Sequence, residues 1–286
     1  EGWAEYEWRW RFPGFPSPRR GFAQPRWDGG PRGGRTVLLH TEQGLGDAVQ
    51  FARYAPLVKA RGGVVVLECE DALVRLFEGL AGVDRVVRKG DPLPRFDVHA
   101  PLMSLPAIFG TAPETVPAAA PYLGMDACVR PLPARRPGAR LRVGIAWAGS
   151  RGHAKNRHRS VPLALFDGLI ARGDLDVVSL QKGDGADALA AHPLRERVLD
   201  LGPALRDLRD TAEALLQLDL VVTVDTAVAH LAGALGVPAW TLLPRDADWR
   251  WMAEREDTPW YPAMRLLRQP AVGDWASVFV RVEREV

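Results

Sequence analysis

The sequence predicts an α/β protein made of two doubly wound domains that face each other across a cleft. Short apolar runs alternate with amphipathic helical patterns, in two successive series along the 286 residues. Some strand runs, such as "LRVGIAW" at 141–147, are continuously apolar, as in parallel strands buried on both faces. A Pro- and Ala-rich stretch at 111–137 separates the two series. Because such sheets bind ligands beyond the carboxyl ends of their strands, we expect functional residues in the loops that follow strands.

The pattern divides the chain into four parts. Residues 1–34 combine helix-like aromatic spacing with a Pro-, Gly- and Arg-rich stretch, which is typical of a helix end and a linker within a longer protein. Residues 35–137 and 138–270 are the two predicted doubly wound domains. Residues 271–286 are expected to form a C-terminal helix that packs back on the N-terminal domain.

Each domain follows the periodicity expected of β-α-β units. The predicted elements of the first domain are a strand at 36–40, a helix at 47–60, a strand at 64–69, a helix at 72–80 and strands at 84–87 and 96–100. The second domain begins with the "LRVGIAW" strand. Its other predicted elements are a helix at 162–172, strands at 176–180 and 198–201, a helix at 211–218, a strand at 220–224, a helix at 226–235 and a strand at 239–243.

The composition excludes several classes of protein. A formal net charge of +2 is too close to neutral to predict binding to nucleic acid. No apolar run approaches the roughly 18 residues of a membrane-spanning helix. The start of the chain has neither a secretory-signal nor a transit-peptide pattern. Cys69 and Cys128 are too few for a disulfide framework or a metal cluster, and we interpret both as buried, reduced thiols of a cytoplasmic protein.

The first candidate loop is "EQGLGD", which joins the strand ending at His40 to a helix. Gly44 and Gly46 allow a sharp turn and a close approach of the backbone to a ligand. Asp47 lies at the helix start, where it either caps the helix or acts as a general base. The segment lacks the third glycine of a dinucleotide-binding fingerprint, which disfavours a nicotinamide enzyme.

Two loops of the second domain follow its first two strands. "WAGSRGHAKNRHRS" contains Gly149 and the cations Lys155, Arg157 and Arg159, and it is either a solvated basic loop or a phosphate-binding loop. "SLQKGD" places Gln181 after the next strand, where its amide either reads a base or sugar edge or belongs to a polar turn.

The segment "VDTAVAHLAGALG" carries the most information. Its apolar stripe faces the sheet, which groups Thr226, His230 and Gly233 on the opposite face of the helix. Asp225 and Thr226 lie at the strand-to-helix junction, where backbone N–H groups and the helix dipole attract an anion such as a diphosphate. In the alternative interpretation, Asp225 is a helix cap and His230 is an exposed surface histidine.

The last candidate loop crowds Trp249, Trp251, Trp260 and Tyr261 after the final predicted strand. These aromatic residues either stack on a base or sugar or form a local cluster that fixes a long loop. The Asp-x-Asp at 246–248 follows Pro-Arg and lacks a third ligand, so we expect no metal site there.

The segments "EQGLGD", "VGIAWAGS", "VSLQ" and "VDTAVAHLAGALG", in this order, resemble glycosyltransferases of the two-domain architecture called GT-B. More narrowly, the chain is similar to family 9, typified by bacterial heptosyltransferases, and to related domains found C-terminal to tetratricopeptide repeats in bacteria. The resemblance runs from Glu1 to Gln269. It implies two Rossmann-like domains, an acceptor-side domain at 35–137 and a nucleotide-sugar-binding domain at 138–270.

The resemblance also implies an activity, a metal-independent and inverting transfer of a sugar from a nucleoside-diphosphate sugar to a hydroxyl group. Asp47 is then the catalytic base, and Gln43, Gly44 and Gly46 form the acceptor-side loop. The expected donor-binding residues are Gly149, Lys155, Arg157, Gln181, Asp225, Thr226, His230 and Trp249. The nucleotide sugar is a co-substrate, and no further cofactor is expected.

The acceptor implied by the resemblance is a saccharide or a protein such as flagellin. The spacing within "HAKNRHRS" departs from that of heptosyltransferases, which leaves the donor sugar open. Two alternative functions remain, a heptosyltransferase acting on lipopolysaccharide and a catalytically inactive scaffold that serves as a protein-interaction module.

Overall fold

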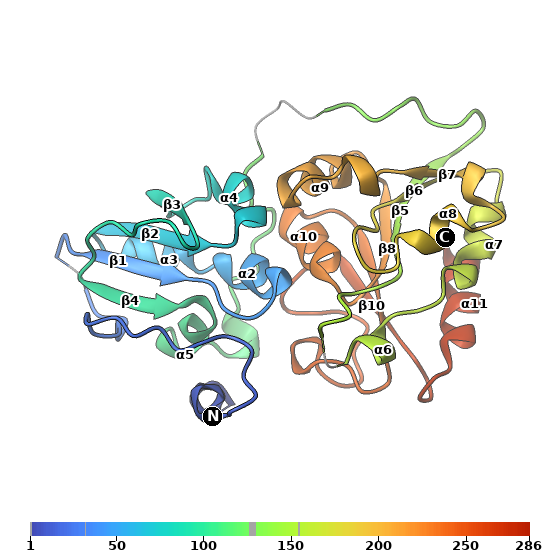
Figure 1. The fold of residues 1–286 in the computed structure, drawn as a ribbon. Helices are drawn as coiled ribbons and strands as arrows, with labels where there is room; N and C mark the ends of the chain where they lie inside the picture. The colour runs from blue at the N-terminus through green and yellow to red at the C-terminus, as the bar shows by residue number, and fades with distance from the viewer. Residues whose placement is uncertain (1, 32, 126–129, 154) are drawn as a thin grey trace. The chain divides into compact units, whose positions relative to one another are not determined.

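A computed structural model describes residues 2–31, 33–125, 130–153 and 155–286 (Figure 1). The chain divides into two compact units, Glu1–Gly124 and Met125–Val286. Each unit contains one parallel sheet, as the sequence predicts. The division lies earlier than the expected boundary at residue 137, because the end of the crossing segment is already bound to the second unit. The Leu132 N–H, for example, donates to Gln217 Oε1 at 2.8 Å.

Unit 1 has a four-stranded sheet in the order β3-β2-β1-β4, with all neighbouring strands parallel. Its strands are β1 (Thr36–His40), β2 (Val64–Cys69), β3 (Arg85–Arg88) and β4 (Val98–Pro101). Its helices are α1 (Gly2–Tyr6), η1 (Glu7–Arg11), α2 (Leu45–Ala52), α3 (Ala55–Ala60), α4 (Asp71–Phe77), η2 (Leu102–Ser104), α5 (Leu105–Ile108) and η3 (Pro113–Thr115). The predicted helix at 47–60 is divided in two. Pro56 lacks the N–H that would continue the hydrogen-bond ladder from α2 into α3.

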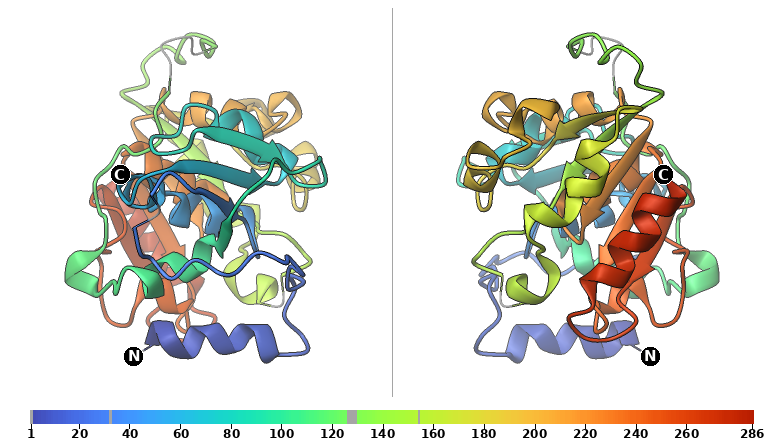
Figure 2. Two further views of the ribbon diagram at one scale, coloured as in Figure 1. Left: turned by 90° about the vertical axis from the view of Figure 1, so that its left-hand side faces the viewer. Right: turned by 90° about the vertical axis from the view of Figure 1, so that its right-hand side faces the viewer.

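The described residues of the segment 1–34 are packed into unit 1. Arg9 of η1 is buried and its Nη2 lies 2.7 Å from Glu42 Oε1. Trp27 is buried, and its backbone N–H donates to the His99 carbonyl at 2.8 Å. The stretch crosses one face of the sheet (dark blue in Figure 2), where Phe22 packs beside a small cluster of Leu38, Val66 and Val87.

Unit 2 has six parallel strands in the order β10-β9-β8-β5-β6-β7. Its strands are β5 (Leu141–Ala146), β6 (Leu175–Ser179), β7 (Val198–Asp200), β8 (Leu220–Val224), β9 (Ala239–Leu243) and β10 (Met264–Arg268). Its helices are α6 (Asn156–Arg159), η4 (Leu163–Phe166), α7 (Asp167–Ala171), α8 (Asp187–Ala190), η5 (Arg195–Arg197), η6 (Gly202–Ala204), α9 (Leu208–Leu215), α10 (Ala227–Leu235), η7 (Trp249–Trp251) and α11 (Trp275–Glu285). Counted within the unit, the strand order is 3-2-1-4-5-6, as in dinucleotide-binding folds.

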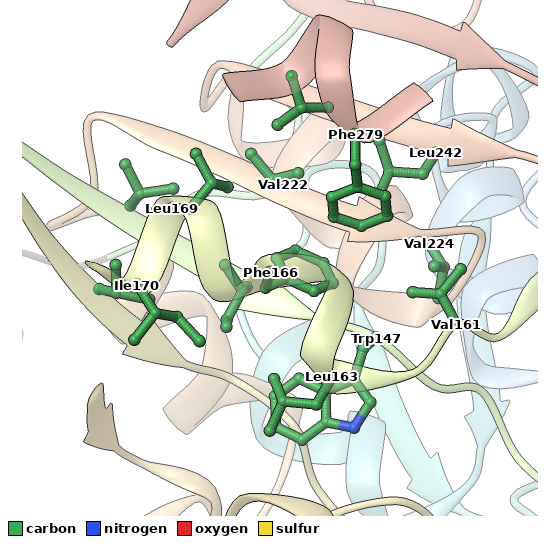
Figure 3. Close-up of a cluster of buried hydrophobic side chains, with 14 of the residues drawn as sticks. Trp147, Val161, Leu163, Phe166, Leu169, Ile170, Val222, Val224, Leu242 and Phe279 are labelled. Carbon is green, nitrogen blue, oxygen red and sulfur yellow. The ribbon is translucent and has the colours of Figure 1, made fainter. Parts of the chain in front are cut away.

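Helix α11 packs into unit 2 (Figure 2). Val278, Phe279 and Val282 on its apolar face are part of the main hydrophobic core of this unit. Figure 3 shows Phe279 among the side chains of this core. The Phe279 ring meets Phe166 edge to face, with 4.8 Å between ring centroids. The apolar face of this helix is therefore buried in the core of its own unit, and the expected packing on the N-terminal domain stays a prediction.

Two expectations from composition concern membrane-spanning helices and the two cysteines. Within the described ranges, no helix is both long and apolar enough to cross a bilayer. Cys69 is buried, and burial raises the pKa of its thiol to about 12. Cys128 lies outside the described residues.

Candidate functional site

The strand order identifies where a ligand would bind in each unit. In doubly wound sheets the crevice lies at the carboxyl ends of the two strands between which the order reverses. These strands are β1 and β4 in unit 1, and β5 and β8 in unit 2. The loops after β1, β5 and β8 are three of the loops that the sequence singles out.

The loop after β1 turns at Gln43 and not at its glycines. Gln43 has a φ of 62°, in the left-handed region, and its backbone N–H donates to Ser17 Oγ at 2.7 Å. Gly44 is extended, with φ −93° and ψ 167°, and Gly46 lies inside α2. The expected sharp turn is therefore present, but Gln43 makes it, and the prediction that Gly44 and Gly46 make it is wrong. An amide N–H of Gln43 also donates to the Tyr6 hydroxyl at 2.5 Å.

Asp47 is half-buried in the first turn of α2. Its Oδ2 accepts a hydrogen bond from the Gly44 backbone N–H at 2.8 Å, so the carboxylate caps the helix. A carboxylate has about four acceptor positions, so one capping bond does not exclude a second function as a base. The structural interpretation of Asp47 is thus realised, and the catalytic one stays a prediction.

Beside Asp47 lies a buried ion-pair cluster that the sequence analysis missed. Glu42, 3% exposed, accepts hydrogen bonds from Arg9 Nη2 at 2.7 Å and Arg9 Nε at 3.3 Å. Burial raises the pKa of Glu42, and Arg9 opposes this shift. Arg9 also binds Ser104 Oγ and Glu7 Oε1, both at 2.8 Å. The cluster therefore fastens η1 to the loop that carries the predicted base.

The basic loop after β5 presents a different cation from those predicted. Lys155 and Arg157 are exposed, and Arg157 Nε lies 3.1 Å from His158 Nε2. Arg159 is half-buried, and its Nε is buried with no hydrogen-bond partner in the described part of the chain. A Cβ at Gly149 would lie 2.8 Å from Arg159 Nη2. Gly149 therefore makes room for the Arg159 guanidinium, which we add to the candidate site.

Gln181 joins two loops, which favours the polar-turn interpretation over donor binding. Its Oε1 accepts from the N–H groups of Trp147 and Ala148 at 3.0 and 2.9 Å. Its Nε2 donates to the carbonyls of Ala148 and Asp184 at 3.0 and 2.8 Å. Both amide donors and both acceptor positions are used, so this buried side chain has no capacity left for a base or sugar.

The N-terminus of α10 lies at the end of β8. Its N-cap, Thr226, makes no side-chain capping bond. Asp225 is 7% exposed, and burial raises its pKa, while the positive charges of Arg250 and Arg159 act in the opposite direction. The charge of Arg159 therefore opposes the rise in the pKa of Asp225, the residue before the N-cap, although the two residues are far apart in sequence.

His230 is buried, which contradicts the alternative of an exposed surface histidine. Its Nδ1 lies 2.9 Å from the Tyr261 hydroxyl, its Nε2 lies 4.0 Å from Asp225 Oδ1, and its ring stacks on Trp251 at 5.1 Å between centroids. A Cβ at Gly233 would lie 2.4 Å from the Tyr261 ring. The face of α10 predicted from spacing therefore packs on the last candidate loop.

The aromatic residues of that loop divide into two groups. Trp251, Trp260 and Tyr261 are buried and form the cluster that fixes the loop, whereas Trp249 is 44% exposed. Asp248 caps η7 through the Arg250 backbone N–H. In the described ranges, no group of three or more His, Cys, Asp or Glu side chains is placed to hold a metal ion.

Comparisons with known proteins identify one relative by sequence and several solved structures with a similar fold. No protein-family profile matches the chain. Protein FlbA of Caulobacter vibrioides is 30% identical over 316 aligned residues, which cover 99% of this chain and 51% of FlbA. The chain thus spans about half the length of this curated relative.

Two solved structures are similar over most of their length. Glycosyl transferase family 9 from Veillonella parvula is 12% identical with a TM-score of 0.59, covering 88% of this chain and 90% of that one. The ADP-heptose LPS heptosyltransferase II of E. coli is 14% identical with a TM-score of 0.54, covering 87% and 99%. The chain therefore has the two-unit α/β fold of heptosyltransferases, which is the predicted GT-B architecture.

Proposed function

We propose that this chain transfers a sugar from a nucleoside-diphosphate sugar to a hydroxyl acceptor. The observation that carries the proposal is the N-terminus of α10, which has no side-chain cap and lies at the strand-order reversal of unit 2. First-turn N–H groups and the helix dipole suit a diphosphate. The buried, unpartnered Nε of Arg159 supplies a second reason to expect an anion at this place.

The proposed reaction is a single displacement. Asp47 accepts the proton of the acceptor hydroxyl as its oxygen forms a bond to the anomeric carbon. The bond between that carbon and the diphosphate oxygen breaks, and the leaving group keeps the electron pair. Arg159 and the α10 N–H groups stabilise the new negative charge, so the proposed step needs no metal and inverts the anomeric carbon. Asp225 and His230 hold the helix start in place.

The donor class is supported by the shared fold, because the E. coli neighbour is named for ADP-heptose. The proposal extends to a cytoplasmic enzyme with a protein acceptor such as flagellin, as in the domains attached to tetratricopeptide repeats that the sequence resembles. Trp249, the exposed first residue of η7, is the proposed surface for the base or sugar ring.

The first test replaces the proposed base. Asp47→Asn keeps an acceptor for the Gly44 N–H but removes the basic carboxylate, so we expect transfer to fall about 100-fold or more, with donor affinity unchanged. Asp71→Asn is the matched control, an exposed acid in the first turn of α4. Activity of Asp47→Asn within a few-fold of the control would remove Asp47 from catalysis.

The second test concerns the donor. Thermal shifts against UDP-, GDP-, CMP- and ADP-sugars identify a bound donor, because ligand binding to the folded state raises the melting temperature. We expect Arg159→Gln to abolish the shift more fully than Lys155→Gln or Arg157→Gln. A shift that survives added EDTA supports metal independence. If no donor gives a shift, the scaffold interpretation replaces the enzyme.

A further inference from the structure

A cavity of about 180 Å³ lies within unit 1, and the sequence analysis did not predict it. His40 and His99 line it from β1 and β4, the two strands between which the strand order reverses. The other side is lined largely by the N-terminal segment, through Trp10, Phe22 and three arginines. The volume exceeds the roughly 30 Å³ share of one water molecule and is below the roughly 300 Å³ of drug-sized pockets. It suits a small polar ligand.

The charged groups around the cavity leave one positive charge without a partner. Arg20 is paired with the buried carboxylate of Glu68, and Arg26 Nη2 lies 2.8 Å from Glu7 Oε2. Arg19 also lines the cavity; it is exposed to solvent and has no ion pair in the described part of the chain. The lining contains no acidic side chain. An anion in the cavity would therefore meet one uncompensated guanidinium and two compensated ones.

The two histidines supply a neutral donor. Their rings are joined by a hydrogen bond between His40 Nε2 and His99 Nδ1 at 3.2 Å. Burial, more than the neighbouring positive charges, lowers the pKa of both histidines, and that of His40 falls to about 3. Both rings are therefore neutral at neutral pH. Each neutral imidazole carries one N–H, and the shared bond uses one of the two protons. Whichever ring donates, one outer nitrogen of the pair remains an N–H donor.

The cavity also has aromatic walls. The Phe22 and His99 rings meet edge to face, with 5.0 Å between their centroids. The Arg20 guanidinium lies 4.7 Å from the centroid of the Phe22 ring. The Trp10 ring is covered by the Arg9 guanidinium at 4.7 Å. The indole N–H of Trp10 is buried without a hydrogen-bond partner in the described chain, and such a donor favours a site that brings in an oxygen acceptor. A ligand with an oxyanion and a ring face matches these walls.

We propose that this cavity binds a small saccharide that carries an oxyanion, a phosphate or a carboxylate, with Arg19 as its charged contact. The guanidinium binds the oxyanion, the histidine pair donates one hydrogen bond, and the aromatic walls contact the sugar ring. The site belongs to unit 1 alone and does not depend on the transfer reaction proposed above.

Calorimetric titration tests the site directly. Inorganic phosphate, glucose 6-phosphate, glucuronic acid and glucose are titrated at constant ionic strength, without a nucleotide sugar. We expect the two sugar anions to bind and glucose not to bind, and their relative affinities distinguish a phosphate from a carboxylate ligand. Imidazole nitrogen shifts of His40 and His99 in NMR spectra locate the bound anion in the cavity.

Single substitutions make the test specific. Arg19→Gln removes a charge-assisted contact, and we expect it to weaken binding of the sugar anions about tenfold or more. Arg85→Gln is the matched control, because Arg85 is exposed on β3, at the far edge of the sheet from β4. Asp47→Asn is expected to bind the anions normally, which separates this proposal from the proposed enzyme activity.

Three results would overturn the proposal. They are no binding of either sugar anion at millimolar concentrations, equal binding by Arg19→Gln and Arg85→Gln, and anion binding that leaves both histidine rings unshifted.

Discussion

Replacing Gln181 by leucine tests whether this side chain joins loops or binds a ligand. The substitution keeps a similar volume but removes all four hydrogen bonds to the backbone of Trp147, Ala148 and Asp184. Each bond contributes about 0.5–1.5 kcal/mol, so the four together contribute about 2–6 kcal/mol. Because Gln181 is buried, water does not replace the lost partners easily. We expect the free energy of unfolding to fall by about 3 kcal/mol.

Urea denaturation, followed by circular dichroism, measures this loss. Gln217→Leu is the matched control. Gln217 also bonds the backbone, through Leu132, Arg130 and Glu213, but it is only half-buried, so water replaces its partners and the loss is expected to stay below about 1 kcal/mol. If Gln181→Leu is as stable as wild type but no longer binds a nucleotide sugar, the loop-joining interpretation is wrong.

The remaining predictions concern other buried contacts. Gly233→Ala places a Cβ 2.4 Å from the Tyr261 ring, so we expect the free energy of unfolding in urea to fall by about 1–3 kcal/mol despite the higher helix propensity of alanine. Burial lowers the pKa of His40 to about 3, so the unfolded chain binds its proton at higher pH than the folded one. Stability should be complete above pH 6.5 and decrease as the pH falls toward 3, by about 2 kcal/mol at pH 5, and His40→Gln should reduce this slope. Arg9→Gln leaves the buried Glu42 carboxylate without its cation, and we expect it to cost about 3 kcal/mol and to release the N-terminal segment to limited proteolysis.

Each of these predictions has an outcome that contradicts it. Gly173→Ala serves as the control for Gly233→Ala, because a Cβ at Gly173 would meet no atom within 4 Å. Equal stability of the two variants would mean that Tyr261 adjusts without cost. An unchanged acid slope in His40→Gln would assign the pH dependence to other groups. Protease resistance of Arg9→Gln would show that apolar contacts alone hold the N-terminal segment.

The strands of this fold are readable from the sequence, but several long-range contacts are not. The apolar runs of the sequence predict nine of the ten described strands, and only β10 (Met264–Arg268) is missing from the predicted elements. The amphipathic pattern of α11 predicts a helix with one apolar face but does not say which core receives it. Gln181 shows the same limit, because its polarity is visible in the sequence and its four backbone partners are not.

The basic loop after β5 shows why a cluster of cations in the sequence does not identify the one that we propose to bind the donor. Lys155, Arg157 and Arg159 are close in sequence and chemically similar. The structure separates them, because Gly149 leaves space beside the Arg159 guanidinium, and the positive charge of Arg159 opposes the rise in the pKa of Asp225. Gly149 can be seen in the sequence, but only the structure of α6 shows that Gly149 lies beside Arg159.

At Asp47, helix capping and the proposed catalytic function support each other. A general base must hold a fixed orientation to receive a proton, and the bond from the Gly44 N–H fixes one carboxylate oxygen. Asparagine at this position retains an oxygen acceptor for the cap, whereas alanine loses both the cap and the base. If Asp47 only caps the helix, Asp47→Ala should lose about 1 kcal/mol of stability while Asp47→Asn stays active. If it is also the base, both variants lose activity, although only alanine loses stability, so the two functions separate in one pair of variants.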